Sequence, residues 1–131
     1  MQICNGIFER NYGDYEWITT TTIRQTVPNW TVWSHGCPGG EDAEQVEGRC
    51  TRAICTALDA PGPGPGPGPG PGDIALFAHG HILRALAGTW LGLGAAGGQL
   101  LPLATASVSI LGWEREIRAI QRWNAPTNPK P

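Results

Sequence analysis

Two histidines, His79 and His81, directly follow a continuous apolar run at residues 74–78 (IALFA). Such a run predicts a strand that is buried on both faces of an open α/β sheet, and the apolar pattern of residues 82–87 predicts a helix after it. Sheets of this kind bind ligands where the carboxyl end of a strand meets the N-terminus of the next helix, whose free N–H groups favour an anion. We therefore expect His79 to meet a phosphate or a carboxylate. The alternative, a hydrogen-bonded histidine that caps the end of the strand, remains open.

Three other stretches agree with this one in order and spacing. They are residues 8–16 (FERNYGDYE), 33–41 (WSHGCPGGE) and 106–124, which begins Ala-Ser-Val and ends Trp-Asn. Together with residues 77–93 (FAHGHILRALAGTWLGL), they resemble the histidine phosphatase superfamily, the phosphoglycerate-mutase-like fold. The resemblance is closest to its sugar-phosphatase branch, which includes sedoheptulose-bisphosphatase-like enzymes. It covers nearly the whole chain but only the later part of the family's domain.

The resemblance implies roles for five residues. In the family, a phosphoryl group moves to the histidine of an Arg-His-Gly motif while a separate carboxylic acid protonates the leaving oxygen. Glu9 falls on the position of that acid, and His79 on that of a second histidine in the phosphate pocket. Gly80 (through its N–H), His81 and Arg84 are candidate phosphate or substrate contacts. For Arg84 the alternative is that its charged head reaches the surface.

The sequence contains no Arg-His-Gly. His35-Gly36 imitates this motif, but no arginine precedes His35 and no apolar strand leads to it, so we expect a loop there rather than a nucleophile. Two residues near Glu9 depart from the family pattern: Phe8 stands where a polar residue is common, and Trp17 stands where glycine is usual. If the backbone at that glycine position has a positive φ, Trp17 strains the loop behind the acid.

The fold that the resemblance implies is an incomplete three-layer α/β/α sandwich of the phosphoglycerate-mutase-like type, without the first central strand and its helix. Residues 1–124 would form this C-terminal part of a histidine-phosphatase domain, and residues 125–131 a disordered tail. A sheet without a central strand exposes unpaired edges and an apolar face. We therefore expect low stability for the chain alone, or self-association through the exposed sheet edge.

Local patterns predict the remaining elements. The clearest helix is expected at residues 42–58, where Asp42 can cap the helix, Gln45 completes a near capping box, and an apolar stripe should lie on the sheet. Residues 61–72 are six Pro-Gly units, which predict a solvated loop or linker within the domain. The other expected elements are a short helix or turn at 19–25 and an antiparallel hairpin with strands at 104–113 and 117–123.

Composition narrows the class of protein and partner. With 131 residues, 40% of them apolar, the chain suits at most one globular domain. A net charge of −2 argues against nucleic acid as a partner, and no apolar run approaches the roughly 20 residues of a membrane span. The first residues lack the pattern of a signal peptide, so we expect a cytoplasmic protein. The four cysteines form no CxxC pair, and we expect no local disulfide, no zinc or other metal site, and no cofactor.

Two functions remain in competition. The first is hydrolysis of a phosphomonoester, with a small phosphorylated metabolite such as a sugar phosphate as the partner, provided that another polypeptide supplies the nucleophile and its strand. The second is a truncated, catalytically inactive remnant that binds phosphate weakly through the His79 end or binds nothing. The absence of Arg-His-Gly favours the second function for these 131 residues.

Overall fold

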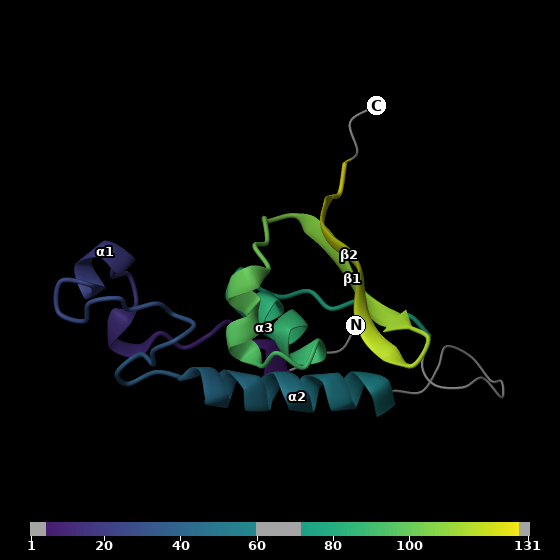
Figure 1. Ribbon diagram of the computed structural model, residues 1–131, viewed down its shortest axis with the longest axis horizontal. Helices are drawn as coiled ribbons and strands as arrows, with labels where there is room; N and C mark the ends of the chain where they lie inside the picture. Colours follow the sequence, from purple (N-terminus) through teal and green to yellow (C-terminus); the bar gives the residue numbers. More distant parts are fainter. Residues whose placement is uncertain (1–4, 60–71, 129–131) are drawn as a thin grey trace.

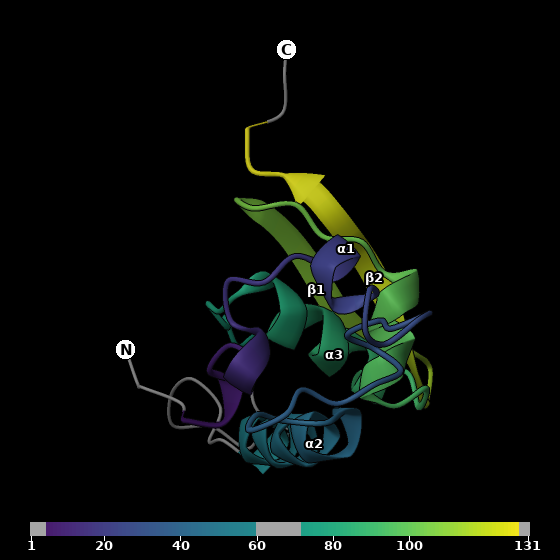
Figure 2. The ribbon, with the colours of Figure 1, turned by 90° about the vertical axis from the view of Figure 1, so that its left-hand side faces the viewer.

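The structure, a computed structural model, describes residues 5–59 and 72–128. Its elements in chain order are η1 (Asn5–Ile7), η2 (Gly13–Tyr15), α1 (Thr20–Ile23), α2 (Ala43–Asp59), α3 (Gly80–Trp90), η3 (Ala95–Leu100), β1 (Ser107–Glu114) and β2 (Ile117–Pro126), where η marks a 3-10 helix. Helix α3 lies between α2 and the β1–β2 hairpin (Figure 1), and the view turned by 90° shows the same arrangement (Figure 2). The Pro-Gly repeat that was expected to form a loop lies, except for Gly72, outside the described residues.

Helix α2 confirms the helix expected at 42–58. The Gln45 N–H donates to Asp42 Oδ1 at 2.8 Å, and the Asp42 N–H donates to Gln45 Oε1 at 3.0 Å, which completes the capping box. Val46, Cys50 and Ile54 form its buried stripe. This stripe contacts α3 and the turns η1 and η3 rather than a sheet. The expectation that α2 lies on the sheet is therefore wrong for the described residues, because the apolar surface of α3 covers the stripe instead.

Helix α3 is the centre of the apolar core. Ile82 and Ala85 are fully buried, and Trp90 is 6% exposed. The Trp90 indole N–H donates to the carbonyls of Gly112 and Ala119, both at 3.2 Å, and so joins the end of α3 to both strands of the hairpin. The helix expected after His79 is confirmed, and it is buried on nearly all sides as its composition predicts.

The hairpin is also confirmed, with β1 and β2 antiparallel. Its turn contains Arg115, whose φ of 55° is in the left-handed region. Strand β2 extends further than expected: Ala125 and Pro126, which were assigned to the tail, pair with Val108 and Ser107. Strand β2 therefore ends two residues beyond the expected boundary at residue 124, and residues 129–131 are outside the described part.

The strand expected at residues 74–78 is absent from the structure, where residues 72–79 have no regular secondary structure. That prediction is wrong because a strand of this apolar type needs neighbouring strands on both sides, and the sheet found within residues 5–59 and 72–128 is the β1–β2 hairpin alone. Its side chains are consequently uncovered: Ile74 is 44% exposed, and Phe77 is 87% exposed. The result is a partial α/β fold with a small antiparallel sheet.

The segment between η2 and α2 folds around a second apolar cluster formed by Ile23, Trp30 and Cys37. Within it, the Thr19 side chain accepts a hydrogen bond from the Thr22 N–H and caps α1, which confirms the short helix expected there. No helix in the described ranges is long and apolar enough to span a membrane.

Candidate active site

The structure brings Glu9 to the start of α3. Oε1 of Glu9 accepts hydrogen bonds from the N–H groups of Ile82 (2.9 Å) and Arg10 (3.0 Å), and Oε2 accepts one from the N–H of His81 (3.2 Å). The first N–H groups of a helix have no partner within the helix and carry partial positive charge, so they favour an anion. Two segments more than 70 residues apart in the sequence thus meet through one carboxylate.

His79 occupies the N-cap position of α3 with an extended backbone, and its side chain makes no capping hydrogen bond. The residue is exposed, and so is Gly80. A Cβ placed on Gly80 would meet no atom within 4 Å, so the space beside the helix start is open. The alternative of a hydrogen-bonded histidine capping a strand end does not describe this side chain, since neither a preceding strand nor a capping bond is found at it.

His81 is half-buried between aromatic rings. Its imidazole stacks on Trp33, with ring centroids 4.2 Å apart and planes 21° apart, and meets the edge of Tyr12 at 6.1 Å. Arg10 Nη1 lies 3.5 Å from its Nε2. Burial, together with the charges of Arg10 and Arg84, lowers the pKa of His81 to about 4, so the ring is neutral near pH 7. The ring is held inside the fold, and the N–H of the residue is the group that meets Glu9.

Arg84 lies on the same side of α3 as His81, three residues further along. Its guanidinium carbon sits 4.8 Å from the centre of the Trp33 ring, which makes a cation–π contact. Nε donates to the Gly98 carbonyl at 3.1 Å, and Nη2 lies 3.5 Å from the Gln99 carbonyl oxygen. These contacts hold the guanidinium against η3, so its charged head is not free at the surface, and the expected substrate contact of Arg84 stays a prediction.

Arg10 is a residue of this region that the sequence did not reveal. It is 2% exposed, and its guanidinium donates to the carbonyls of Glu41 (2.6 Å), Val32 and His35 (3.4 Å). Its Nε has no hydrogen-bond partner among the described residues. The only available signal was its place beside Glu9, because an arginine in a polar segment such as FERNY is ordinarily exposed.

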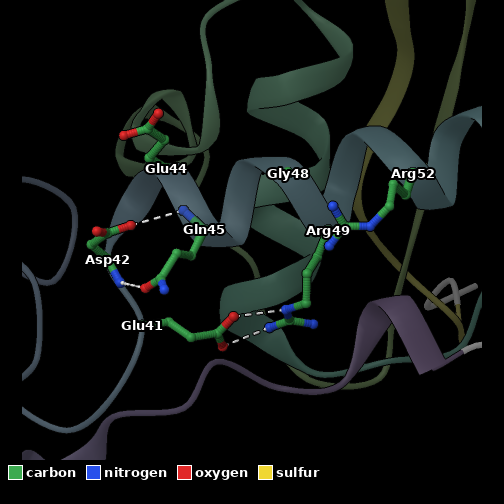
Figure 3. Close-up of a pocket in the computed structure, with 7 residues that line it drawn as sticks. All are labelled: Glu41, Asp42, Glu44, Gln45, Gly48, Arg49 and Arg52. Carbon is green, nitrogen blue, oxygen red and sulfur yellow. Dashed lines mark hydrogen bonds and ion pairs between the residues drawn. The ribbon is translucent and has the colours of Figure 1, made fainter.

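Glu41 and Arg49 form a two-pronged ion pair at the start of α2, with Nε–Oε2 at 2.8 Å and Nη2–Oε1 at 2.9 Å (Figure 3). Burial alone would raise the pKa of Glu41, but the hydrogen bonds from Arg49 and from the Asn11 N–H, with the charges of Arg49 and Arg10, lower it. Figure 3 shows the open surface depression around this pair, lined by Glu41, Asp42, Glu44, Gln45, Gly48, Arg49 and Arg52. It contains none of the five residues that the sequence assigned to the site.

Three residues singled out in the sequence have a visible structural outcome. His35 lies in an exposed loop, as expected, where its Nδ1 is 2.7 Å from the Ser34 hydroxyl. Trp17 has a φ of 63°, so the expected backbone strain is present, and its side chain is 99% exposed. Phe8, beside Glu9, is 60% exposed.

The arrangement combines a carboxyl group, an exposed imidazole and an open helix start. A carboxyl group can give a proton to a leaving oxygen, and an imidazole with helix N–H groups can contact phosphoryl oxygens. The three histidines of the sequence follow serine, alanine and glycine, so none stands in an Arg-His-Gly motif. The site therefore holds groups suited to proton donation and phosphate contact, without an arginine-flanked nucleophile.

Comparison with known proteins places this geometry in a family. The model of the histidine phosphatase superfamily (branch 1) matches residues 1–126. An acid phosphatase of Mycobacterium tuberculosis is 36% identical over 94% of this chain and 57% of its own length, and a sedoheptulose 1,7-bisphosphatase of Saccharomyces cerevisiae is 36% identical over 66% and 34%.

A solved structure of an open reading frame product of Mycobacterium tuberculosis superposes with a TM-score of 0.78 at 36% identity, over 90% of this chain and 57% of that one. The chain thus spans about half the length of the first relatives it matches. The match of the family model over nearly all of its residues, together with these relatives, shows that this chain belongs to the histidine phosphatase superfamily.

Proposed function

We propose that Glu9 and the first residues of α3 form the acid half of a site that hydrolyses phosphomonoesters of small metabolites such as sugar phosphates. The observation that carries this proposal is the contact of the Glu9 carboxylate with the N–H groups of His81 and Ile82, directly beside the exposed His79. The names of two relatives, an acid phosphatase and a sedoheptulose 1,7-bisphosphatase, support the reaction class and the substrate class.

In this reaction a nucleophilic imidazole attacks phosphorus while the bond to the leaving oxygen breaks, and water then hydrolyses the phosphohistidine. His79 and the N–H of Gly80 contact the phosphoryl oxygens. The Glu9 carboxylate takes up a proton from water once it has left the N–H groups of α3, and it gives that proton to the leaving oxygen. A phosphoryl group that enters at the open start of α3 competes with Glu9 for the same N–H groups. Substrate binding thereby releases the carboxyl group toward the leaving oxygen.

The nucleophile is the part of the site that these residues do not supply. His81 is held between Trp33 and Tyr12, and His35 lies in an exposed loop. We therefore expect turnover only when a second polypeptide segment contributes an Arg-His-Gly motif. The second candidate function, a catalytically inactive remnant with weak phosphate binding, is favoured by this absence of an arginine-flanked histidine from the sequence.

The test is release of inorganic phosphate from an aryl phosphate and from a sugar bisphosphate. The 131-residue chain is assayed alone, and as a fusion with the part of the Mycobacterium tuberculosis acid phosphatase that lies outside the aligned region. We expect no release by the chain alone and turnover by the fusion. In the fusion, Glu9→Gln or His79→Ala should lower kcat by about 100-fold or more, whereas His35→Ala should not.

Each other outcome has a defined meaning. A fusion that folds but releases no phosphate would leave the inactive remnant as the function of this chain. Turnover by the chain alone that is lost in His79→Ala would show that it has a nucleophile of its own, and loss of that turnover in His35→Ala would identify it.

A further inference from the structure

We infer that Glu41 is the positioning residue for Glu9, because it organises hydrogen bonds to the backbone on both sides of that acid. The inference rests on the proposed function only for the catalytic role of Glu9. The contacts themselves are properties of the fold.

On the N-terminal side of Glu9, Arg49 links the Glu41 carboxylate to the backbone. Its Nη1 donates to the carbonyl of Gly6 at 2.9 Å and to that of Phe8 at 3.0 Å. The other two nitrogens of the guanidinium bind the two carboxylate oxygens of Glu41. A guanidinium held in two places by one carboxylate has a fixed orientation, so Glu41 determines where the third nitrogen points.

On the C-terminal side, Glu41 makes the contacts itself. Its N–H donates to the Asn11 carbonyl at 2.9 Å, and its Oε1 accepts from the Asn11 N–H at 2.9 Å. Its carbonyl accepts from Nη2 of the buried Arg10 at 2.6 Å. Backbone and side chain of Glu41 thus fix the two residues that follow Glu9.

Residues 8–12 have no regular secondary structure of their own, so contacts with other segments hold them in place: those of Glu41 and Arg49, and the hydrogen bonds of Arg10 to the carbonyls of Val32 and His35. The side chains of Glu41 and Arg49 are only 18% and 17% exposed, so their pair is screened less than an ordinary surface pair. A shift of the segment would carry the Glu9 carboxylate away from the N–H groups of His81 and Ile82. Glu41 is therefore the residue that fixes the backbone on both sides of Glu9, directly and through Arg49.

The test uses hydrogen exchange of single amides in the 131-residue chain, measured by NMR. The Ile82 N–H donates to Glu9, so its exchange rate reports the placement of Glu9, while the Leu86 amide, inside α3, reports the helix. In Glu41→Gln we expect the Ile82 amide to exchange at least tenfold faster and the Leu86 amide to keep its rate. The matched control, Glu44→Gln, changes an exposed glutamate of the same depression and should leave both rates unchanged.

Two more variants keep the result interpretable. Glu9→Ala removes the carboxylate altogether, so it gives the largest increase in the exchange rate of the Ile82 amide that loss of this contact can cause. Arg49→Lys retains the charge but cannot bridge Glu41 and two carbonyls, and it should give an intermediate acceleration even if Glu41→Gln does not fold.

An unchanged Ile82 rate in folded Glu41→Gln or Arg49→Lys would overturn the inference, as would an equal acceleration at Ile82 and Leu86. The amide rates do not depend on turnover. A fusion in which Glu9→Gln leaves kcat unchanged would therefore defeat the proposed function without affecting this result.

Discussion

Lowering the pH from 7.5 to 4.5 should destabilise the protein through a single half-buried imidazole. Burial of His81 beside Trp33 and Tyr12, with Arg10 and Arg84 nearby, lowers its pKa from 6.5 to about 4, although the carboxylate of Glu41 acts in the opposite direction. The folded state therefore binds this proton more weakly than the unfolded state does. The resulting stability is complete above pH 6.5 and is lost as the pH falls from 6.5 through about 4.

The size of the effect follows from the same pKa. A decrease from 6.5 to about 4 on folding corresponds to about 3 kcal/mol, at about 1.4 kcal/mol for each pH unit. Because the ring keeps some contact with water, we expect about 2 kcal/mol of loss between pH 7.5 and 4.5. For a small domain with a total stability of about 5–10 kcal/mol, this is a large fraction.

The assay is urea unfolding at pH 7.5, 6.0, 5.0 and 4.5 for the native chain and for His81→Phe. Phenylalanine retains a ring that can stack on Trp33 but carries no proton. Carboxylates gain protons in both proteins alike as the pH falls, so the difference between the two free energies of unfolding isolates the histidine. Relative to the native chain, His81→Phe should become more stable by about 2 kcal/mol as the pH falls from 7.5 to 4.5.

His35→Gln is the matched control, because it removes an exposed histidine and should leave the pH dependence of the native chain in place. If His81→Phe and the native chain lose the same free energy between pH 7.5 and 4.5, the argument from the buried imidazole is refuted.

Two further predictions concern backbone geometry, and both are measured by chemical unfolding. Trp17→Gly should raise the free energy of unfolding by up to about 1 kcal/mol, because it relieves a φ of 63° at a side chain that is 99% exposed; Trp17→Ala retains the strain and should give no gain. Gly88→Ala should lower the free energy of unfolding by about 2 kcal/mol, since its Cβ would lie 2.5 Å from the Gly94 carbonyl oxygen and 2.8 Å from the Gly98 nitrogen. Its control, Gly48→Ala in α2, meets only Arg52 Nη1 at 3.5 Å and should stabilise by up to about 1 kcal/mol.

The elements that the sequence predicted well are those whose signals are local. Helix α2 carries its cap, its capping box and its apolar stripe within 18 residues, counted from Asp42 to Asp59. The hairpin needs only two alternating segments and a polar turn between them. For both, the residues that determine the structure are also those that are adjacent in the chain.

The strand expected at residues 74–78 shows what local sequence patterns fail to predict. Its apolar side chains are typical of a buried strand, but a strand forms only where a neighbouring strand provides hydrogen-bond partners for its backbone. No such neighbour lies beside it in the described residues, so Ile74, Leu76 and Phe77 remain exposed. The sequence pattern indicates that a segment is suited to a buried strand, and only the tertiary structure determines whether neighbouring strands are present to pair with it.

The site shows the same limit at the level of side chains. Glu9 was assigned because it matches a family motif, whereas His79 was also indicated by the apolar run before it and the helical pattern after it. Arg10 and the contacts of Glu41 with residues 10 and 11 escaped notice because they join residues that are 22 to 31 positions apart in the sequence. Polar residues of this kind look like ordinary surface residues until the fold buries them.

The anion predicted at the start of α3 deserves a different interpretation in light of Glu9. The helix start attracts negative charge, as the sequence indicates, but the protein's own carboxylate already accepts the N–H groups of His81 and Ile82. A phosphate can bind there only by exchanging with that carboxylate, which weakens its net affinity. Under the proposed function, the same exchange would free Glu9 to protonate the leaving oxygen. The carboxylate at the helix start would then couple phosphate binding to the release of the proposed acid.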